Sequence, residues 1–560
     1  MRAAGQGGRQ SRRTFLQTVA GAVAVVAASA KRARGAEAAR PNIVLLMADD
    51  LGFSDLGCYG GEVTTPHLDR LADEGLRFSR FYNNALCGPS RASLMTGVNP
   101  HVLGIGSRWT GLLRKNCVTL VELLKQAGYA TSAVGRLDMT TADGWHDPEM
   151  LARHLDRFFG STSHTGPGNY FAVVRGAEDW LNGKAWTPPA DGYYRTDANA
   201  DYAVRFLREQ AAGDRPFFLY AGFSSPHWPL HAREAEITRF RDLYRGLGWD
   251  AARARRHERL AGLGLVRPAW RLAPRDPRVP PWDEAPHGVW EAERMAVYAA
   301  QVHALDRAVG RIMKALDETG AAAHTLVLFL SDNGPSDQVW KRPLDRPGDP
   351  WRRDGTPTRL GNTPDIPPGP ADTFVTYGPP WANVSATPFG GYKGSVYEGG
   401  IATPLIVRWP RGVEARGTVT HALGHITDLM VTCLDVAGAA YPTTFRGRTV
   451  RPLEGESLLP VFEGRERPER QPVCWEMRNH RAVRTDRWKL IGRKGRPWKL
   501  FDMHADRTET RDVAGDHPDR VEALARVFAT WSREAKRGAG GGRLTGNGRL
   551  HGLAVRLRRP

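Results

Sequence analysis

The sequence predicts an α/β protein with a mixed, mostly parallel sheet between helices, followed by a small α+β domain with an antiparallel sheet. Three observations lead to this prediction: continuous apolar runs of strand length that end in polar residues, a long amphipathic helix between two of these runs, and a change of texture after about residue 465. With 560 residues, of which 41% are hydrophobic, the chain can bury a large core and is expected to form one large and one small domain.

Four continuous apolar runs are predicted to be strands covered on both faces. They are 43–48 (IVLLMA), 217–222 (FFLYAG), 325–330 (TLVLFL) and 405–409 (LIVRW). The first stops at Asp49-Asp50, the second before Pro226-His227, and the third at Ser331-Asp332-Asn333. Because ligands bind at the carboxyl ends of parallel strands, these polar groups are expected to converge on one site.

A long helix is predicted between the second and third runs, because apolar residues recur there at alternating gaps of three and four. They are Met295, Tyr298, Val302, Leu305, Val309, Ile312 and Leu316. Gly320 is expected to cap this helix, and His303, which lies off the stripe, is expected at the surface or at a satisfied core edge. The Pro/Arg/Gly-rich stretch from about 335 to 380 predicts a long active-site loop.

After about residue 465 the sequence predicts short strands and one helix. The strands are expected at 473–477, 480–484, 488–491 and 498–503, and the helix at 518–536. The predicted organisation is therefore a main domain over 39–465 and an antiparallel-sheet subdomain over 466–536. The Gly/Arg-rich tail, 537–560, is expected to be disordered.

The net charge of +18 is concentrated at the two ends of the chain. Residues 1–38 carry seven Lys/Arg and one Glu, and residues 537–560 carry six Arg and no acid, which together make two thirds of the excess. This distribution argues against a nucleic-acid partner, since the body of the chain is only mildly basic.

The N-terminus resembles a twin-arginine export signal. It reads Ser11-Arg12-Arg13-Thr14-Phe15-Leu16, followed by an apolar run from Val19 to Ala30 that is too short to span a bilayer comfortably. The expected partner is the twin-arginine export machinery, and the expected location is the bacterial periplasm or the medium. Such cargo folds before export, so a side chain can be modified in the cytoplasm first.

Five cysteines without a C-x-x-C pair argue against a disulfide framework and against a cysteine zinc site. One of them opens the segment Cys87-Gly88-Pro89-Ser90-Arg91, which is followed by Thr96-Gly97. Pro89 suits the first turn of a helix, and this places residue 87 at a helix N-terminus, where an anion binds well. Arg91, four residues on, is expected to reach the same group.

This segment resembles the signature of the sulfatase family, C-x-P-S-R followed by a short helix and Thr-Gly. The resemblance covers nearly all of residues 40–536 and implies the fold of alkaline phosphatase. It also implies that a maturation enzyme converts Cys87 to formylglycine. One hydroxyl of the aldehyde hydrate then attacks sulfur, and the other collapses to release sulfate, so that no water needs to attack the covalent intermediate.

A carboxylate cluster is expected beside residue 87. Asp49, Asp50, Asp332 and Asn333 form an all-oxygen set, which favours a hard ion such as calcium over zinc. The resemblance implies the same four residues as calcium ligands, with residue 87 and a sulfate oxygen completing the shell. Such a cation would lower the pKa of the nucleophilic hydroxyl and offset charge on the sulfate.

The resemblance assigns two further residues to the reaction. His227 matches the family's histidine that protonates the departing oxygen. Lys393, just before Glu398-Gly399-Gly400, matches the lysine that contacts sulfate.

One segment departs from the family pattern, which is usually G-K-W-H. Here the chain reads Gly135-Arg136-Leu137-Asp138. Arg136 keeps the positive charge and is expected to bind sulfate with a different reach. Asp138 cannot donate as histidinium does, although a carboxylate can accept the proton that drives sulfate elimination. His146 is a candidate to compensate.

The expected activity is hydrolysis of an organic sulfate ester, of a small molecule or a saccharide, with Cys87, Arg91, His227 and Lys393 as catalytic residues. The sequence leaves the leaving group open among aryl, alkyl and sugar. It also leaves open two other readings: a phosphate or phosphonate ester hydrolase on the same fold, and a degenerate protein that binds sulfated ligands without cleaving them.

Overall fold

The computed structural model describes residues 40–106, 112–113, 116–137, 140–141, 151, 154–161, 168–173, 179–189, 191–340 and 357–537. The predicted export signal, the basic tail beyond residue 537, and the residues Asp138 and His146 lie outside these ranges. All elements named below belong to one compact unit that begins at Asn42.

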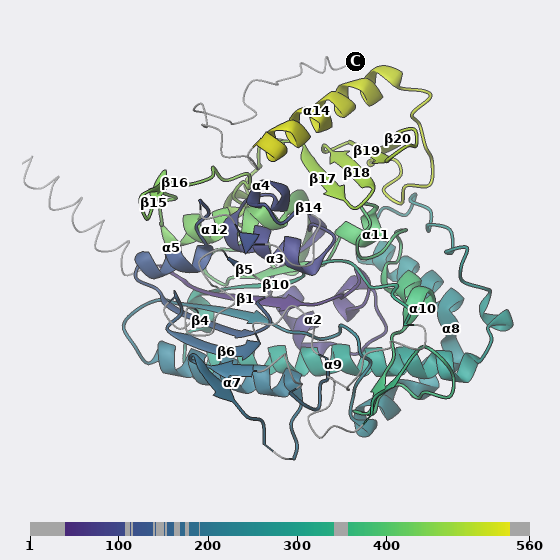
Figure 1. Cartoon of the computed structure of the whole chain (residues 1–560), viewed down its shortest axis with the longest axis horizontal. Coiled ribbons are helices and arrows are strands. Elements are labelled where there is room, and N and C mark those ends of the chain that lie inside the picture. Colours follow the sequence, from purple (N-terminus) through teal and green to yellow (C-terminus); the bar gives the residue numbers. More distant parts are fainter. Residues whose placement is uncertain are drawn as a thin grey trace, which may run out of the picture. The chain divides into compact units, whose positions relative to one another are not determined.

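A ten-stranded sheet forms the centre of the molecule, in the order β14-β2-β13-β10-β1-β9-β4-β6-β7-β8 (Figure 1). The strands are β1 (Asn42–Ala48), β2 (Leu76–Tyr82), β4 (Ala130–Gly135), β6 (Arg157–Ser161), β7 (Asp179–Leu181), β8 (Lys184–Trp186), β9 (Phe217–Gly222), β10 (Thr325–Ser331), β13 (Leu405–Arg408) and β14 (Thr418–His425). The central pairs β10-β1, β1-β9, β9-β4 and β4-β6 are parallel, whereas β13 runs antiparallel to both of its neighbours. The predicted mixed, mostly parallel sheet is confirmed.

Helices cover both faces of this sheet, which explains why its central strands are continuous apolar runs. Along β1, Val44 and Leu46 pack into one core and Leu45 and Met47 into the other. The first core is covered by α2 (Pro66–Asp73), α7 (Arg195–Ala211), α8 (Glu234–Gly262) and α9 (Gly288–Glu318), and the second by α3 (Cys87–Thr96), α5 (Leu120–Gln126) and α12 (Ile426–Ala437). In Figure 1, α7 and α9 lie on one side of the strands and α5 and α12 on the other.

The predicted long helix is α9, which begins at Gly288, earlier than the apolar stripe indicates, and ends at Glu318. Gly320, with φ of 70°, follows its last turn. His303 is buried, and its Nδ1 lies 2.9 Å from the carbonyl oxygen of Thr64, so it is a satisfied core histidine. The described parts of the predicted loop contain β11 (Arg359–Leu360), β12 (Thr373–Phe374) and the start of α10 (Gly378–Ser385).

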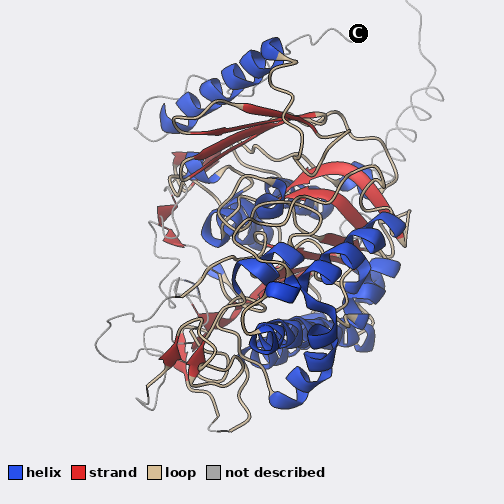
Figure 2. Cartoon of the chain, turned by 90° about the vertical axis from the view of Figure 1, so that its right-hand side faces the viewer, coloured by secondary structure: helices blue, strands red, loops and turns tan. Residues whose placement is uncertain are grey.

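The C-terminal part forms the predicted antiparallel sheet. Its strands β17 (Val473–Met477), β18 (His480–Arg484), β19 (Trp488–Arg493) and β20 (Lys499–Asp502) pair in chain order, and α14 (Pro518–Arg537) covers one face (Figure 2). Leu490 packs in the core beneath α14, whereas its neighbour Ile491 joins the core of the main part. The sheet is therefore buried on both faces. The boundary at 465/466 stays a prediction.

The remaining described elements are short. They are η1 (Gly57–Tyr59), α4 (Pro100–Leu103), β3 (Leu112–Leu113), β5 (Thr140–Thr141), η2 (Trp282–Glu284), η3 (Ala322–His324), α11 (Glu398–Ile401), β15 (Thr444–Phe445), β16 (Arg448–Thr449) and α13 (Leu459–Phe462). Within the ranges given above, no helix has the length and apolar character needed to span a bilayer.

Candidate active site

Strand register brings the predicted site residues to one edge of the sheet. Ala48 of β1 pairs with Ser331 of β10, and Met47 pairs with Gly222 of β9, which in turn pairs with Gly135 of β4. The segments that leave these four parallel strands therefore start at the same level. They carry Asp49-Asp50, Asp332-Asn333, His227 and Arg136.

The backbone at Asp50 explains how two consecutive carboxylates serve one site. Successive side chains of an extended strand point to opposite faces, but Asp50 has φ of 66°, a left-handed conformation that Asp tolerates better than most residues. Both side chains are buried. The amide nitrogen of Asn333 donates to Asp50 Oδ1 at 2.7 Å, and the backbone N–H of Asp50 donates to Asp332 Oδ1 at 3.4 Å. The two loops thus form one cluster.

Cys87 is the first residue of α3, as predicted, and the residue is 1% exposed. Arg136 connects it to the carboxylates: Nη2 lies 3.6 Å from Cys87 Sγ, while Nη1 pairs with Asp49 Oδ2. Gly135 permits this arrangement, because a Cβ there would come within 2.1 Å of the carbonyl oxygen of Gly222. The arginine that replaces the expected lysine therefore delivers its charge to residue 87.

Arg91 contacts the carboxylates with its whole guanidinium group. Nε and Nη2 lie 2.9 and 2.8 Å from Asp332 Oδ2, and Nη2 lies 3.3 Å from Asp49 Oδ2. Nη1 donates to the hydroxyl of Tyr220 at 2.8 Å and to the carbonyl of Arg136 at 2.9 Å. These contacts fit a positioning role beneath the site. Tyr220 was not predicted as a site residue from the sequence. The sequence signal that could have indicated it is a hydroxyl group within an apolar strand, near the carboxyl end of that strand.

Lys393 and His227 both approach Asp50. Lys393 Nζ lies 2.5 Å from Asp50 Oδ1, and its loop is held where the backbone N–H of Lys393 donates to the carbonyl of Pro335 at 2.9 Å. His227 Nδ1 lies 2.6 Å from the carbonyl of Trp228, which can only accept, so Nδ1 carries a proton. Its Nε2 lies 3.5 Å from Asp50 Oδ2 and faces the cluster.

The electrostatics of the cluster are those of crowded carboxylates held by cations. Burial acts to raise the pKa of Asp49, but Arg136 and other cations outweigh it and hold that pKa below its ordinary value. Burial, with the charge of Asp49, raises the pKa of Asp332 to about 7. Burial also lowers the pKa of His227. A further cation among these oxygens would relieve the repulsion between the carboxylates.

The oxygen atoms of the cluster fit a divalent cation. Asp49 Oδ1, Asp50 Oδ2 and Asn333 Oδ1 are buried and accept no hydrogen bond within the part of the chain that the structure describes. Asp49, Asp50 and His227 each offer a ligand atom within 4.8 Å of the other two. Uncharged and anionic oxygens are the donors that calcium prefers, so His227 remains available for another role. The predicted metal set is brought together in space.

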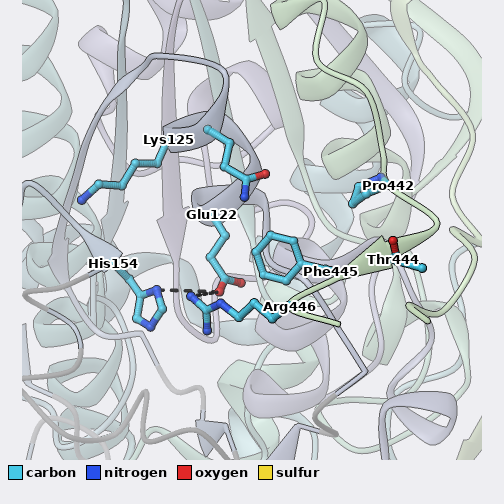
Figure 3. A pocket seen from close by; sticks show the side chains of 8 residues that line it. Glu122, Lys125, His154, Pro442, Thr444, Phe445 and Arg446 are labelled. Atoms are coloured by element: carbon cyan, nitrogen blue, oxygen red, sulfur yellow. Dashed lines mark ion pairs between the residues drawn. The ribbon is translucent and has the colours of Figure 1, made fainter. Parts of the chain in front are cut away.

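A cavity of about 400 Å³ lies elsewhere (Figure 3). It lies between α5 and the β15–β16 hairpin and includes none of the residues discussed above. Its central acid, Glu122, is paired with Arg446 at 3.1 Å and lies 3.7 Å from His154. The candidate chemistry therefore belongs to the edge of the large sheet rather than to this hollow.

Comparison with known proteins agrees with this geometry. The family model described as Sulfatase matches residues 41–439, a span that includes all of the site residues above. The model described as N-sulphoglucosamine sulphohydrolase, C-terminal, matches residues 391–527.

Similar relatives extend over most of the chain. An uncharacterized sulfatase of Schizosaccharomyces pombe is 29% identical over 544 residues, covering 89% of this chain and 94% of the relative. An arylsulfatase of Klebsiella aerogenes is 28% identical over 477 residues, covering 81% and 98%. The solved structure of Ps i-CgsB in complex with k-i-k-neocarrahexaose has a TM-score of 0.64 and 25% identity, covering 88% and 93%.

Proposed function

The chain belongs to the sulfatase family and is a sulfuric ester hydrolase, and on that premise we propose that a formylglycine formed from Cys87 and a calcium ion constitute its reaction centre. The ion would be held by Asp49, Asp50, Asp332 and Asn333. The observation that carries this proposal is the set of buried oxygens on Asp49, Asp50 and Asn333, beside the N-terminus of α3, that accept no hydrogen bond from the described residues.

In this centre the formylglycine would supply the nucleophile, and a bound calcium ion would supply positive charge against the sulfate. The chain's own residues do the rest. Lys393 and Arg136 bind the sulfate oxygens. His227, when it carries a second proton at Nε2, where it faces Asp50, gives that proton to the ester oxygen as the alcohol departs and returns to the neutral ring with its proton on Nδ1. Arg91 holds the ion-binding carboxylates in place from below.

The proposal is tested on the tryptic peptide that ends at Arg91. Trypsin cleaves after Arg80 and Arg91, so the peptide FYNNALCGPSR contains residue 87. In active protein from its native host we expect the mass of the aldehyde and its reaction with a hydrazine. Active protein in which this peptide carries only a free thiol would overturn the formylglycine assignment.

Binding of a divalent cation is expected to stabilise the fold. At a free calcium concentration a hundred times Kd, a site specific for the folded state adds about 2.7 kcal/mol to the free energy of unfolding. Asp50→Asn should abolish most of this gain, because it removes a charged ligand. Asp242→Asn, at a side chain 98% exposed, is the matched control and should keep the gain. Equal calcium stabilisation of both variants in thermal unfolding would place the ion elsewhere.

The contact of Arg136 with Cys87 argues against the hypothesis that the protein binds sulfated ligands without cleaving them. Arg136, which replaces the usual lysine, still brings a positive charge to the reacting position. The alternative activity, hydrolysis of phosphate or phosphonate esters, stays a prediction. Relative turnover of matched aryl sulfate and aryl phosphonate esters decides between it and sulfate specificity.

We also propose that the protein acts in the periplasm or outside the cell, because residues 11–16 carry the twin-arginine pattern. Changing Arg12 and Arg13 to lysine is expected to leave the folded, active enzyme in the cytoplasmic fraction. Unchanged export of this double variant would contradict the assignment.

The substrate class includes sulfated saccharides as well as aryl sulfates. The similar structure of Ps i-CgsB contains k-i-k-neocarrahexaose, and a similar relative is an arylsulfatase. The residues beside His227 bear on which of these leaving groups the enzyme prefers.

A further inference from the structure

Three aromatic side chains gather next to His227. Trp228 follows it directly, Trp340 lies in the loop that leaves β10 through Asn333, and Phe374 belongs to β12. Because β9 and β10 flank β1 in parallel, both tryptophans come from segments that leave the same edge of the sheet as the site residues. These three residues are called the aromatic cluster below.

The members of the aromatic cluster contact one another. The ring of Trp228 lies 5.3 Å from that of Trp340 and 5.5 Å from that of Phe374, and Trp340 lies 5.6 Å from Phe374. The ring of Trp228 is also 4.2 Å from that of His227. Phe374 is 1% exposed, whereas both tryptophans are half-buried. The cluster therefore has a buried floor and two rings that reach the surface beside the histidine.

The indole nitrogens of these two tryptophans differ in their hydrogen bonding from those of five other tryptophans. The indole nitrogens of several other tryptophans donate to backbone carbonyls: Trp249, Trp270, Trp290, Trp381 and Trp475. Nε1 of Trp228 and of Trp340 is buried and meets no acceptor in the described ranges, and the same holds for Nε1 of Trp409 at the end of β13. Within the described residues no hydrogen bond from the indole nitrogen fixes either ring, and both rings pack against aromatic neighbours, which suits a surface that receives another flat group.

The position of the ester oxygen brings the leaving group of the substrate to this surface. His227 protonates the ester oxygen, and that oxygen is bonded directly to the leaving group. A ring that carries the oxygen, or carries it through one methylene, must therefore lie next to His227, where Trp228 and Trp340 offer apolar ring faces. Aryl rings and the C–H faces of pyranoses pack well on such faces, whereas a linear alkyl chain gains less from them.

We propose that Trp228 and Trp340 form a leaving-group subsite that binds the flat face of a ring, so that the enzyme prefers aryl and pyranose sulfates to linear alkyl sulfates. This inference rests on the proposed function, because it takes His227 as the residue that meets the ester oxygen. Phe374 supports the two rings from below and does not touch the substrate.

The test compares kcat and KM of mature enzyme for three sulfates: 4-nitrophenyl sulfate, a pyranose 6-sulfate and hexyl sulfate. Trp340→Ala is expected to lower kcat/KM for at least one ring substrate by roughly five- to tenfold, mainly through KM, and to leave hexyl sulfate unchanged. The ring substrate whose kcat/KM falls identifies the bound ring as aryl or saccharide. Trp340→Leu, which keeps apolar bulk without a flat face, should show the same selective loss if the alanine variant does not fold.

The matched control is Trp498→Ala, at a half-buried tryptophan that packs on Phe528 at 5.9 Å in the C-terminal part. It should leave all three substrates unchanged. An equal loss on all three substrates, or no loss on any, in the Trp340 variants would overturn the subsite. If mature wild-type enzyme with confirmed formylglycine cleaves none of the three, the proposed function fails instead, and the two failures are distinguishable.

Discussion

Replacing Cys87 by alanine is expected to lower kcat/KM for an aryl sulfate by roughly a thousandfold or more, because it removes the atom from which the nucleophile is made. The change should leave the fold intact. Cys87 is the first residue of α3, and the change to alanine removes only its sulfur atom. Binding of inorganic sulfate should persist in this variant, since Lys393 and Arg136 remain.

Cys433→Ala is the matched control for this substitution. Cys433 is also fully buried, in α12, and burial raises the pKa of its thiol to about 12, so it is an inert core residue. Its alanine variant should lose stability but keep full kcat. Wild-type turnover by the Cys87 variant would remove residue 87 from the reaction.

Arg91→Met is expected to give the largest loss of stability in the site, about 3–5 kcal/mol in the free energy of unfolding with a chelator present. The change leaves two buried carboxylates, Asp49 and Asp332, without the guanidinium that lies 3.3 and 2.8 Å from them. With calcium bound the loss should be smaller, because the ion offsets the same charges. Denaturant unfolding with and without calcium measures both quantities.

Arg70→Met is the control for this prediction. Arg70 also pairs with a carboxylate, Glu74, at 2.6 Å, but its side chain is 64% exposed. An exposed pair of this kind contributes about 0–1 kcal/mol. If both arginine variants lost the same small amount, the buried cluster would not depend on Arg91.

The strands of the site could be predicted closely because a strand covered on both faces must be a continuous apolar run. β9 coincides with the predicted run 217–222, and β1 and β10 differ from their predictions by single residues. The antiparallel direction of β13 could not be predicted, because an apolar run has the same composition in either direction. The start of α9 at Gly288 was missed for a related reason, since its first turn is partly exposed and carries no stripe.

The residues that meet at the site could also be named from the sequence, because they follow strands whose carboxyl ends share an edge. The hydrogen-bond and ion-pair partners of these residues could not be predicted from the sequence. Whether Arg91 reaches Cys87 or the carboxylates depends on contacts such as that with Asp332, 241 residues away in the chain. The contact of Arg136 with Cys87 and the role of Tyr220 likewise follow from how β4 and β9 lie against α3.

By itself the sequence determined the type of chemistry: a cysteine at a helix start, an oxygen-rich set of ligands, and the strands that carry them. Only the tertiary structure decided how these groups are paired, and it alone revealed the aromatic cluster beside His227. The physical reason is that composition and periodicity describe each segment separately. Hydrogen bonds, ion pairs and ring contacts depend on the register and packing of segments that are distant in the chain.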